Sequence, residues 1–213
     1  MKFLRVYSIV IILALTSLAC FATNTQSTPS DVLFSDEFSD TSKKWDQVSD
    51  STGNTDYYNN AYRIVVNEVS YDAWANPGNE SFIDTRIEVD ATKNGGPVDN
   101  DFGIICRYID SSQFYFGVVS SDGYYGIMKM TSDGSKPIGK DSMLESDKIS
   151  QGVATNHIRF DCVGSTLTLY VNNSQIDQQT DADYTAGNVG LLAGTFATGG
   201  TDILFDNFYV YKP

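Results

Sequence analysis

The chain has 213 residues, and its 27 acidic against 14 basic side chains give a formal net charge of −13. Nucleic-acid binding needs a basic face that neutralises phosphates, so this charge excludes nucleic acid as the expected partner. It also argues against docking on anionic lipid through charge. Tyrosine (13) and phenylalanine (12) are abundant and glycine (17) outnumbers proline (5), which is typical of strands joined by glycine turns.

The first segment has the pattern of an export signal. Lys2 and Arg5 precede an apolar run over residues 6–15, and small residues follow it. A basic start, a short apolar stretch and a small-residue cleavage zone are the three parts of a signal peptide. We therefore expect residues 1–19 to be removed and the protein to be extracytoplasmic.

Residues 17–20, Ser-Leu-Ala-Cys, are similar to a bacterial lipobox, in which the cysteine carries the lipid. Ser17 departs from the leucine that is usual at its position. The similarity implies that Cys20 is lipidated and anchors the protein to the cell membrane, which it then contacts only through this lipid. Residues 20–31 are polar and fit a flexible tether. Cleavage near Ala22, which gives a secreted protein, is the alternative.

Short strand-like runs recur through residues 32–213, with turn residues between them. No second linker or internal repeat interrupts them, so we expect one domain. The pattern predicts an all-β, two-sheet antiparallel β-sandwich of jelly-roll type. The expected strands cover residues 62–66, 82–89, 102–108, 114–119, 124–130, 157–163, 167–171, 175–179, 189–193 and 203–211.

Two cysteines remain inside this domain. Alternation places Cys106 on the same face as Ile104, and Cys162 on the same face as Ile158 and Phe160. Both thiols are therefore expected to point into the core, where a disulfide between them is one possibility. Two buried free thiols are the other.

Seven short motifs lie between residues 32 and 213, namely DEF (36–38), DFGIICRY (101–108), FYF (114–116), DGYY (122–125), NHIR (156–159), LTLYVN (167–172) and FDNF (205–208). Together they resemble the concanavalin A-like lectin/glucanase jelly-roll superfamily. They also resemble uncharacterised bacterial lipoproteins related to laminin-G-like and 3-keto-disaccharide hydrolase-like domains. The resemblance covers nearly all of residues 32–213 and implies a fold, but that fold hosts lectins, glycosidases and adhesion modules alike.

The catalytic pattern of that superfamily is broken here. Laminarinase-type members carry Glu-x-Asp-x-x-Glu on one strand, and the matching string begins at Glu88 and Asp90 but ends in Lys93. His157 is the only histidine, and no Gly-x-Ser-x-Gly elbow accompanies it. The sequence therefore favours a non-catalytic carbohydrate-binding domain whose partner is a glycan or polysaccharide. A glycoside hydrolase of the 3-keto-disaccharide type and a protein-binding adhesion or structural module of the cell envelope are the alternatives.

The alternation of side chains along the expected strands also indicates which residues could form a sugar-binding surface on one sheet. Aromatic rings stack on the C–H faces of sugars, and charged groups bond their hydroxyls. The alternative is a solvent-exposed sheet face that binds no ligand. Trp74 is expected in a loop over residues 71–78, and its alternative is a position packed beneath that loop. The expected ligand-binding residues are Arg107, Tyr115, Tyr125, Lys129, Arg159 and Trp74.

A structural calcium ion is implied by the same resemblance, because jelly-roll carbohydrate modules often hold one between an early acid and an acid of the last strand. Asp36 and Glu37 are the early acids, and Asp206 interrupts the apolar closing run. Calcium binds several oxygen ligands. A hydrogen-bond network that satisfies these carboxylates without a metal is the alternative.

Overall fold

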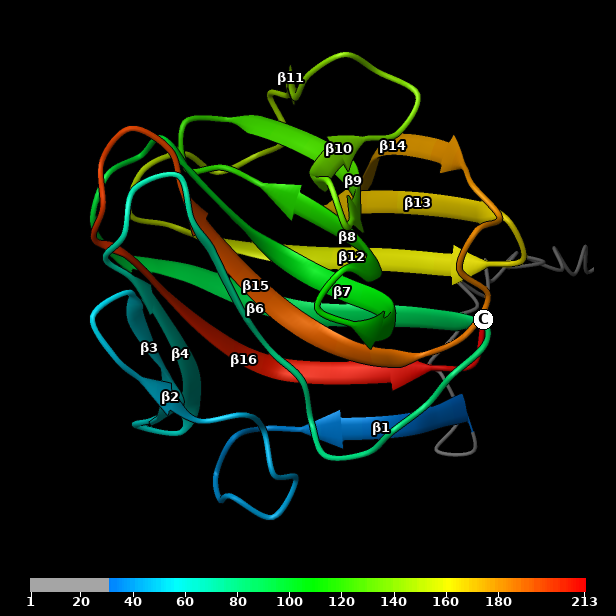
Figure 1. Cartoon of the computed structure of the whole chain (residues 1–213), viewed down its shortest axis with the longest axis horizontal. Coiled ribbons are helices and arrows are strands. Elements are labelled where there is room, and N and C mark those ends of the chain that lie inside the picture. The colour runs from blue at the N-terminus through cyan, green and yellow to red at the C-terminus, as the bar shows by residue number, and fades with distance from the viewer. Residues whose placement is uncertain (1–30) are drawn as a thin grey trace, which may run out of the picture.

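The computed structural model describes residues 31–213, which form two antiparallel sheets packed face to face (Figure 1). The expected signal peptide, the lipidation at Cys20 and nearly all of the tether lie outside these residues. Within them, no helix is long and apolar enough to cross a membrane. The all-β, two-sheet sandwich predicted from the sequence is confirmed.

The first sheet has nine strands. They are β1 (Val32–Asp36), β2 (Val48–Ser49), β3 (Gly53–Tyr58), β4 (Ala61–Val66), β6 (Thr85–Gly95), β12 (Thr155–Val163), β13 (Thr166–Val171), β14 (Ser174–Thr180) and β16 (Thr201–Tyr211). Their order is β14-β13-β12-β6-β16-β4-β3-β2, and β1 also pairs with β16. Burial alternates along β6, so this sheet has one core face and one wetter face.

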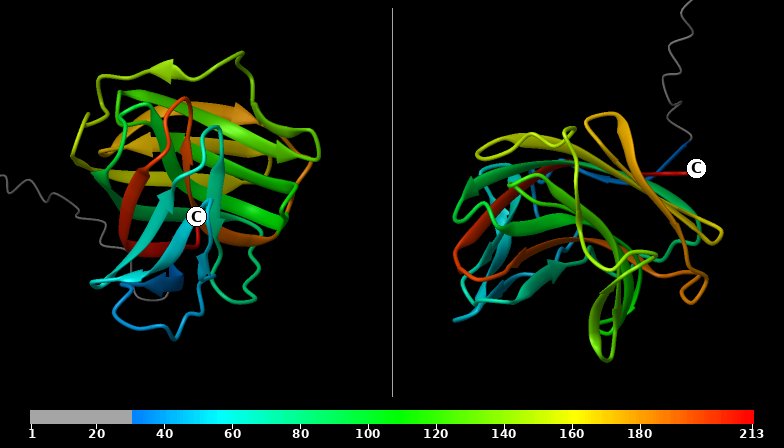
Figure 2. Two further views of the ribbon diagram at one scale, coloured as in Figure 1. Left: turned by 60° about the vertical axis from the view of Figure 1, so that its left-hand side comes forward. Right: turned by 90° about the horizontal axis from the view of Figure 1, so that it is seen from above.

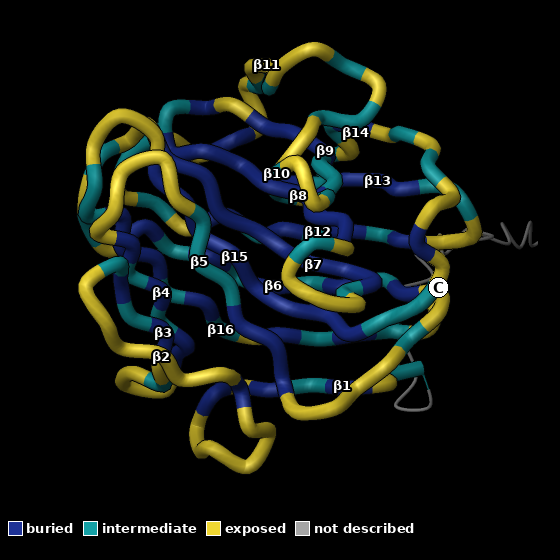
Figure 3. The backbone as a smooth tube through the Cα atoms, in the orientation of Figure 1, coloured by how far each residue is buried: buried dark blue, intermediate teal, exposed yellow. Residues whose placement is uncertain are grey.

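The second sheet has seven strands. They are β5 (Asp72–Ala75), β7 (Asn100–Asp110), β8 (Gln113–Val119), β9 (Tyr124–Thr131), β10 (Gly134–Pro137), β11 (Leu144–Glu145) and β15 (Asn188–Thr195). The order is β10-β9-β8-β7-β15-β5, with β11 paired to β9. Every residue of β15, and all but the first of β8, is buried, so both faces of this sheet are covered (Figure 3).

The main core fills the space between the two sheets, which Figure 2 shows as two curved layers. Gly117 in β8 fixes which way the seven-stranded sheet faces. An ideal Cβ on Gly117 would lie 2.9 Å from Phe160 and 3.0 Å from Leu169, both in the nine-stranded sheet. Gly117 therefore faces the inner core and lets the two sheets approach closely. Its neighbours Phe116 and Val118 point the other way, because successive side chains alternate.

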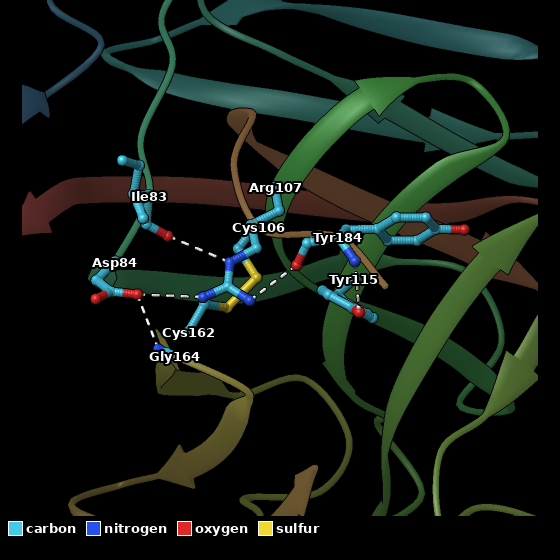
Figure 4. The surroundings of a disulfide bond; sticks show 8 residues. All are labelled: Ile83, Asp84, Cys106, Arg107, Tyr115, Cys162, Gly164 and Tyr184. Atoms are coloured by element: carbon cyan, nitrogen blue, oxygen red, sulfur yellow. Dashed lines mark hydrogen bonds and ion pairs between the residues drawn. A yellow bond between two sulfur atoms is a disulfide. The ribbon is translucent and has the colours of Figure 1, made fainter. Parts of the chain in front are cut away.

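A disulfide joins Cys106 of β7 to Cys162 of β12, with the two Cα atoms 6.7 Å apart (Figure 4). Both residues are completely buried in the core between the sheets. The bond is therefore a covalent link between the two layers.

Arg107 follows the disulfide and is buried, with 2% of its side chain exposed. Its guanidinium donates hydrogen bonds to the carbonyl oxygens of Ile83 and Tyr184 and pairs with Asp84 (Figure 4). The expectation that Arg107 lies on an open face is wrong. Arg107 has a φ of 52° and lies where the β7–β8 register shifts, so strict alternation ends before it.

We predict that replacing Cys106 and Cys162 together by alanine lowers the free energy of unfolding by about 4 kcal/mol, because the disulfide closes a loop of 56 residues. Urea unfolding followed by tryptophan fluorescence measures the change. Dithiothreitol should lower the midpoint of the wild type and leave that of the double variant unchanged. Equal midpoints for the oxidised wild type and the variant would contradict the prediction.

We also predict that Arg107→Met lowers the free energy of unfolding by about 2–4 kcal/mol, since it leaves the buried carbonyl oxygen of Tyr184 and the partly buried one of Ile83 without this donor. Asp84→Asn is the matched control. The Asp84 side chain is 43% exposed, so this change should cost less than about 1 kcal/mol. Thermal and urea unfolding of both variants test the contrast, and wild-type stability of Arg107→Met is the outcome that refutes it.

Candidate functional site

The face of the seven-stranded sheet turned away from the nine-stranded sheet carries a second apolar cluster, which we call the outer cluster. Six of its members are buried, and four are partly exposed and pack against them. The buried members are Ile105, Phe114, Phe116, Val118, Met130 and Leu192, and the partly exposed ones are Trp74, Tyr108, Met128 and Met143. No third layer supplies any of these side chains, since all come from this sheet or from the segment before β11.

Phe114 is the aromatic centre of the outer cluster. Its ring lies 5.5 Å from that of Trp74, 5.4 Å from that of Tyr108 and 5.6 Å from that of Phe116, centroid to centroid. Phe114 itself is completely buried, whereas Trp74 and Tyr108 retain exposed surface. Two rings are thus supported from below and are partly open to a ligand above.

Two carboxylates lie on the same face, one row away from Trp74. Gly194 of β15 pairs with Asp72 of β5 on one side and with Asp101 of β7 on the other. An ideal Cβ on Gly194 would lie 2.1 Å from Oδ1 of Asp101 and 2.3 Å from Oδ1 of Asp72. The two oxygens therefore face each other over a glycine that leaves the space between them free of any side chain.

Burial changes the protonation of this pair. It raises the pKa of Asp72 to about 6. It raises the pKa of Asp101 well above the usual range, and the charge of Asp72 raises it further. Oδ1 of Asp101 is buried and has no hydrogen-bond partner within residues 31–213. A strongly perturbed carboxylate pair beside open aromatic rings is a typical feature of functional sites.

Two hollows adjoin the outer cluster. One, of about 330 Å³, includes Asp72 and Trp74 among its lining residues and extends toward β2 and β3. The other, of about 700 Å³, is lined by Asp122, Tyr124 and Met143 among others. Both volumes lie in the range of small-molecule sites, which combine apolar walls with a few polar groups.

Of the six ligand-binding residues expected from the sequence, Trp74 alone lies on this face, and it lies in strand β5 rather than in a loop. Tyr115 and Tyr125 instead point into the core between the sheets. Lys129 is the cross-strand neighbour of Tyr115, and its Nζ lies 2.9 Å from the carboxylate of Asp181. Tyr115 lies in β8, whereas Tyr125 and Lys129 lie in β9. Because β8 is apolar on both faces, alternation did not reveal which of its faces is the inner one.

Arg159 lies on the other sheet. It projects from the outer side of β12, pairs with Asp161 and stacks its guanidinium 4.4 Å from the ring centroid of Tyr170. The six residues thus lie in four separate places: the outer face (Trp74), the inner face (Tyr115, Tyr125 and Lys129), a buried position (Arg107) and the other sheet (Arg159). The expectation that they share one open face is wrong.

The residues expected to hold calcium already have protein partners. Oδ1 of Asp36 accepts a hydrogen bond from the Phe38 amide at 2.8 Å, and Oδ2 accepts one from the Trp45 indole at 3.0 Å. Glu37 accepts a hydrogen bond from Tyr209, while an oxygen of Asp206 accepts one from the next backbone amide. Across residues 31–213, no three His, Cys, Asp or Glu side chains are grouped to hold a metal ion. Calcium at Asp36, Glu37 and Asp206 stays a prediction.

The sequence matches no protein-family model and no curated protein. Solved structures do match. A carbohydrate-binding module, CBM66 from Bacillus subtilis, has a TM-score of 0.63 at 15% identity, over 79% of this chain and 95% of the module. An endo-acting O-glycanase structure from the human gut microbiota has a TM-score of 0.62 at 12% identity, over 85% and 99% of the two chains.

A β-glucanase from Bacillus licheniformis is similar as well, with a TM-score of 0.59 at 10% identity over 84% of this chain and 97% of the enzyme. Identities this low carry information on the fold and not on the substrate. All three are jelly-roll sandwiches built from two antiparallel sheets. The chain therefore has the concanavalin A-like jelly-roll fold.

Proposed function

We propose that the protein is a non-catalytic, lectin-like carbohydrate-binding module that holds a glycan or polysaccharide on the outer cluster. The observation that carries this proposal is the placement of two supported, partly exposed rings, Trp74 and Tyr108, beside the carboxylates of Asp72 and Asp101. The structures of similar fold include a carbohydrate-binding module and carbohydrate-cleaving enzymes, so this fold can accommodate such a ligand.

The chemistry of the face suits a sugar. A pyranose presents an apolar C–H face and a rim of hydroxyl groups, and the C–H face packs against an aromatic ring such as that of Trp74. The hydroxyl groups donate hydrogen bonds, and the carboxylate of Asp72 is an acceptor within the same hollow. One ligand can therefore satisfy both kinds of surface at once.

A glycoside hydrolase of the 3-keto-disaccharide type is the second candidate, and one observation favours it. Glycosidases use two carboxyl groups, about 5–5.5 Å apart in retaining enzymes and about 6.5–9.5 Å apart in inverting ones. Asp72 and Asp101 form such a carboxyl pair with raised pKa values. Their Oδ1 atoms, however, lie 2.1 and 2.3 Å from one point above Gly194. The two oxygens are therefore closer together than the carboxyl groups of inverting enzymes, which leave room for a water molecule between them.

We predict that Trp74→Ala weakens binding of a glycan at least tenfold, because the ring contributes stacking area, and that Tyr170→Ala on the nine-stranded sheet leaves binding unchanged. Purified protein is screened on a glycan array and on insoluble polysaccharides, and dissociation constants follow by calorimetry. Thermal unfolding confirms that both variants are folded.

If Trp74→Ala and Tyr170→Ala weakened glycan binding equally, the glycan would not bind at the outer cluster. Release of new reducing ends from a bound glycan would establish the hydrolase instead. A protein with no glycan ligand that captures a protein of the cell envelope would be the adhesion or structural module.

The lipid anchor is a proposal based on the sequence around Cys20. We predict that Cys20→Ala abolishes incorporation of labelled palmitate in a bacterial host and moves the protein from the membrane to the soluble fraction. Cell fractionation with an antibody against the domain measures this. A protein that is soluble and unlabelled before the change would instead indicate cleavage near Ala22 and secretion.

A further inference from the structure

We propose that Asp72 and Asp101 bind a hard divalent cation, of the calcium and magnesium class, in the space above Gly194. The site is separate from the acids Asp36, Glu37 and Asp206, and it does not depend on glycan binding.

The geometry supplies two oxygen ligands that converge on one point. Asp72, Gly194 and Asp101 are cross-strand neighbours on three adjacent strands, so the sheet itself fixes the two carboxylates. Their Oδ1 atoms lie 2.3 and 2.1 Å from the position of an ideal Cβ on Gly194. Any other residue at position 194 would fill this space. A cation slightly farther out would have both oxygens near the 2.3–2.6 Å that calcium prefers.

The second line of evidence is an unsatisfied atom. Asp101 is 7% exposed, and its Oδ1, which points into the space above Gly194, is buried without a hydrogen-bond partner among the described residues. Buried carboxylates are normally paired, hydrogen-bonded or coordinated to a metal. Because this oxygen has no donor, the site is incomplete without a further group.

The charges around the pair favour a cation over another ligand. Within residues 31–213 neither Asp72 nor Asp101 forms an ion pair with lysine or arginine, so the protein itself does not neutralise them. Two further acids, Asp99 and Asp122, line the hollow of about 700 Å³, and Asp99 lies two residues before Asp101 in the chain. Asp72 is partly exposed, which lets a hydrated ion enter and keep water in its remaining coordination positions. A proton shared between the carboxyl groups is the competing explanation.

Terbium luminescence and thermal unfolding test the proposal on the intact protein after dialysis against EDTA. Excitation of Trp74, two residues from Asp72, should sensitise bound terbium, and calcium should compete for it. Calcium at about 100 times its dissociation constant should raise the unfolding midpoint by about 5–10 °C. Asp101→Asn should weaken terbium binding at least tenfold and abolish the calcium shift.

Asp133→Asn removes the same charge from an exposed side chain and is the matched control. Asp72→Asn, at the more exposed partner, replaces Asp101→Asn if the latter does not fold. The proposal is overturned if neither calcium, magnesium nor manganese shifts the wild-type midpoint, in which case the pair shares a proton. It is equally overturned if calcium stabilises the wild type and Asp101→Asn alike, since the ion then binds elsewhere.

Discussion

Apolar side chains cover both faces of the seven-stranded sheet, and this double burial is the feature on which the proposed ligand surface depends. One face is covered by the nine-stranded sheet and the other by side chains of its own strands. Within residues 31–213 no further sheet covers this outer face, and only the segment before β11 adds a side chain, Met143, to it. The partly exposed side chains over this buried layer are Trp74, Tyr108, Met128 and Met143. Partly exposed aromatic surface of this kind on a water-facing sheet is typical of a binding face.

The nine-stranded sheet has the opposite character. Its outer face carries charged side chains that are already paired with one another, such as Arg86 with Glu88 and Arg159 with Asp161. Their guanidinium groups also stack on the rings of Tyr211 and Tyr170. A face whose charges and rings satisfy each other is stable in water and needs no ligand. The contrast between the sheets supports our proposal that a glycan binds to the seven-stranded one.

The class of the fold and the approximate positions of ten strands were predictable, because period-two patterns and turn residues are local signals. Strands β1, β3 and β10 were not expected, and β5 was expected to be a loop. The inward orientation of Cys106 and Cys162 was predictable for the same reason. The orientation of β8 was not, since Phe114, Tyr115 and Phe116 are all apolar enough for either face. The bulge at Arg107 also leaves no clear local signal, because arginine rarely adopts a positive φ.

The carboxylate pair was beyond prediction for a different reason. Asp72 and Asp101 become neighbours only through the pairing of β5 and β7 with β15, a strand that lies far along the chain. Cross-strand register depends on the complete sheet, and one residue of slip would move either aspartate to the other face. Gly194 is the local sign of the pair in the sequence. It becomes informative only when its cross-strand neighbours, Asp72 and Asp101, are known.

The most direct test of the account uses the methionine methyl groups as reporters. Met128, Met130 and Met143 all belong to the outer cluster, so ¹³C-methyl methionine spectra observe this face alone within the described domain. If the account is correct, titration with an oligosaccharide that the protein binds shifts the methyl resonances of Met128 and Met143. Saturated binding that leaves these resonances unmoved would show that the glycan lies on another surface and would contradict it.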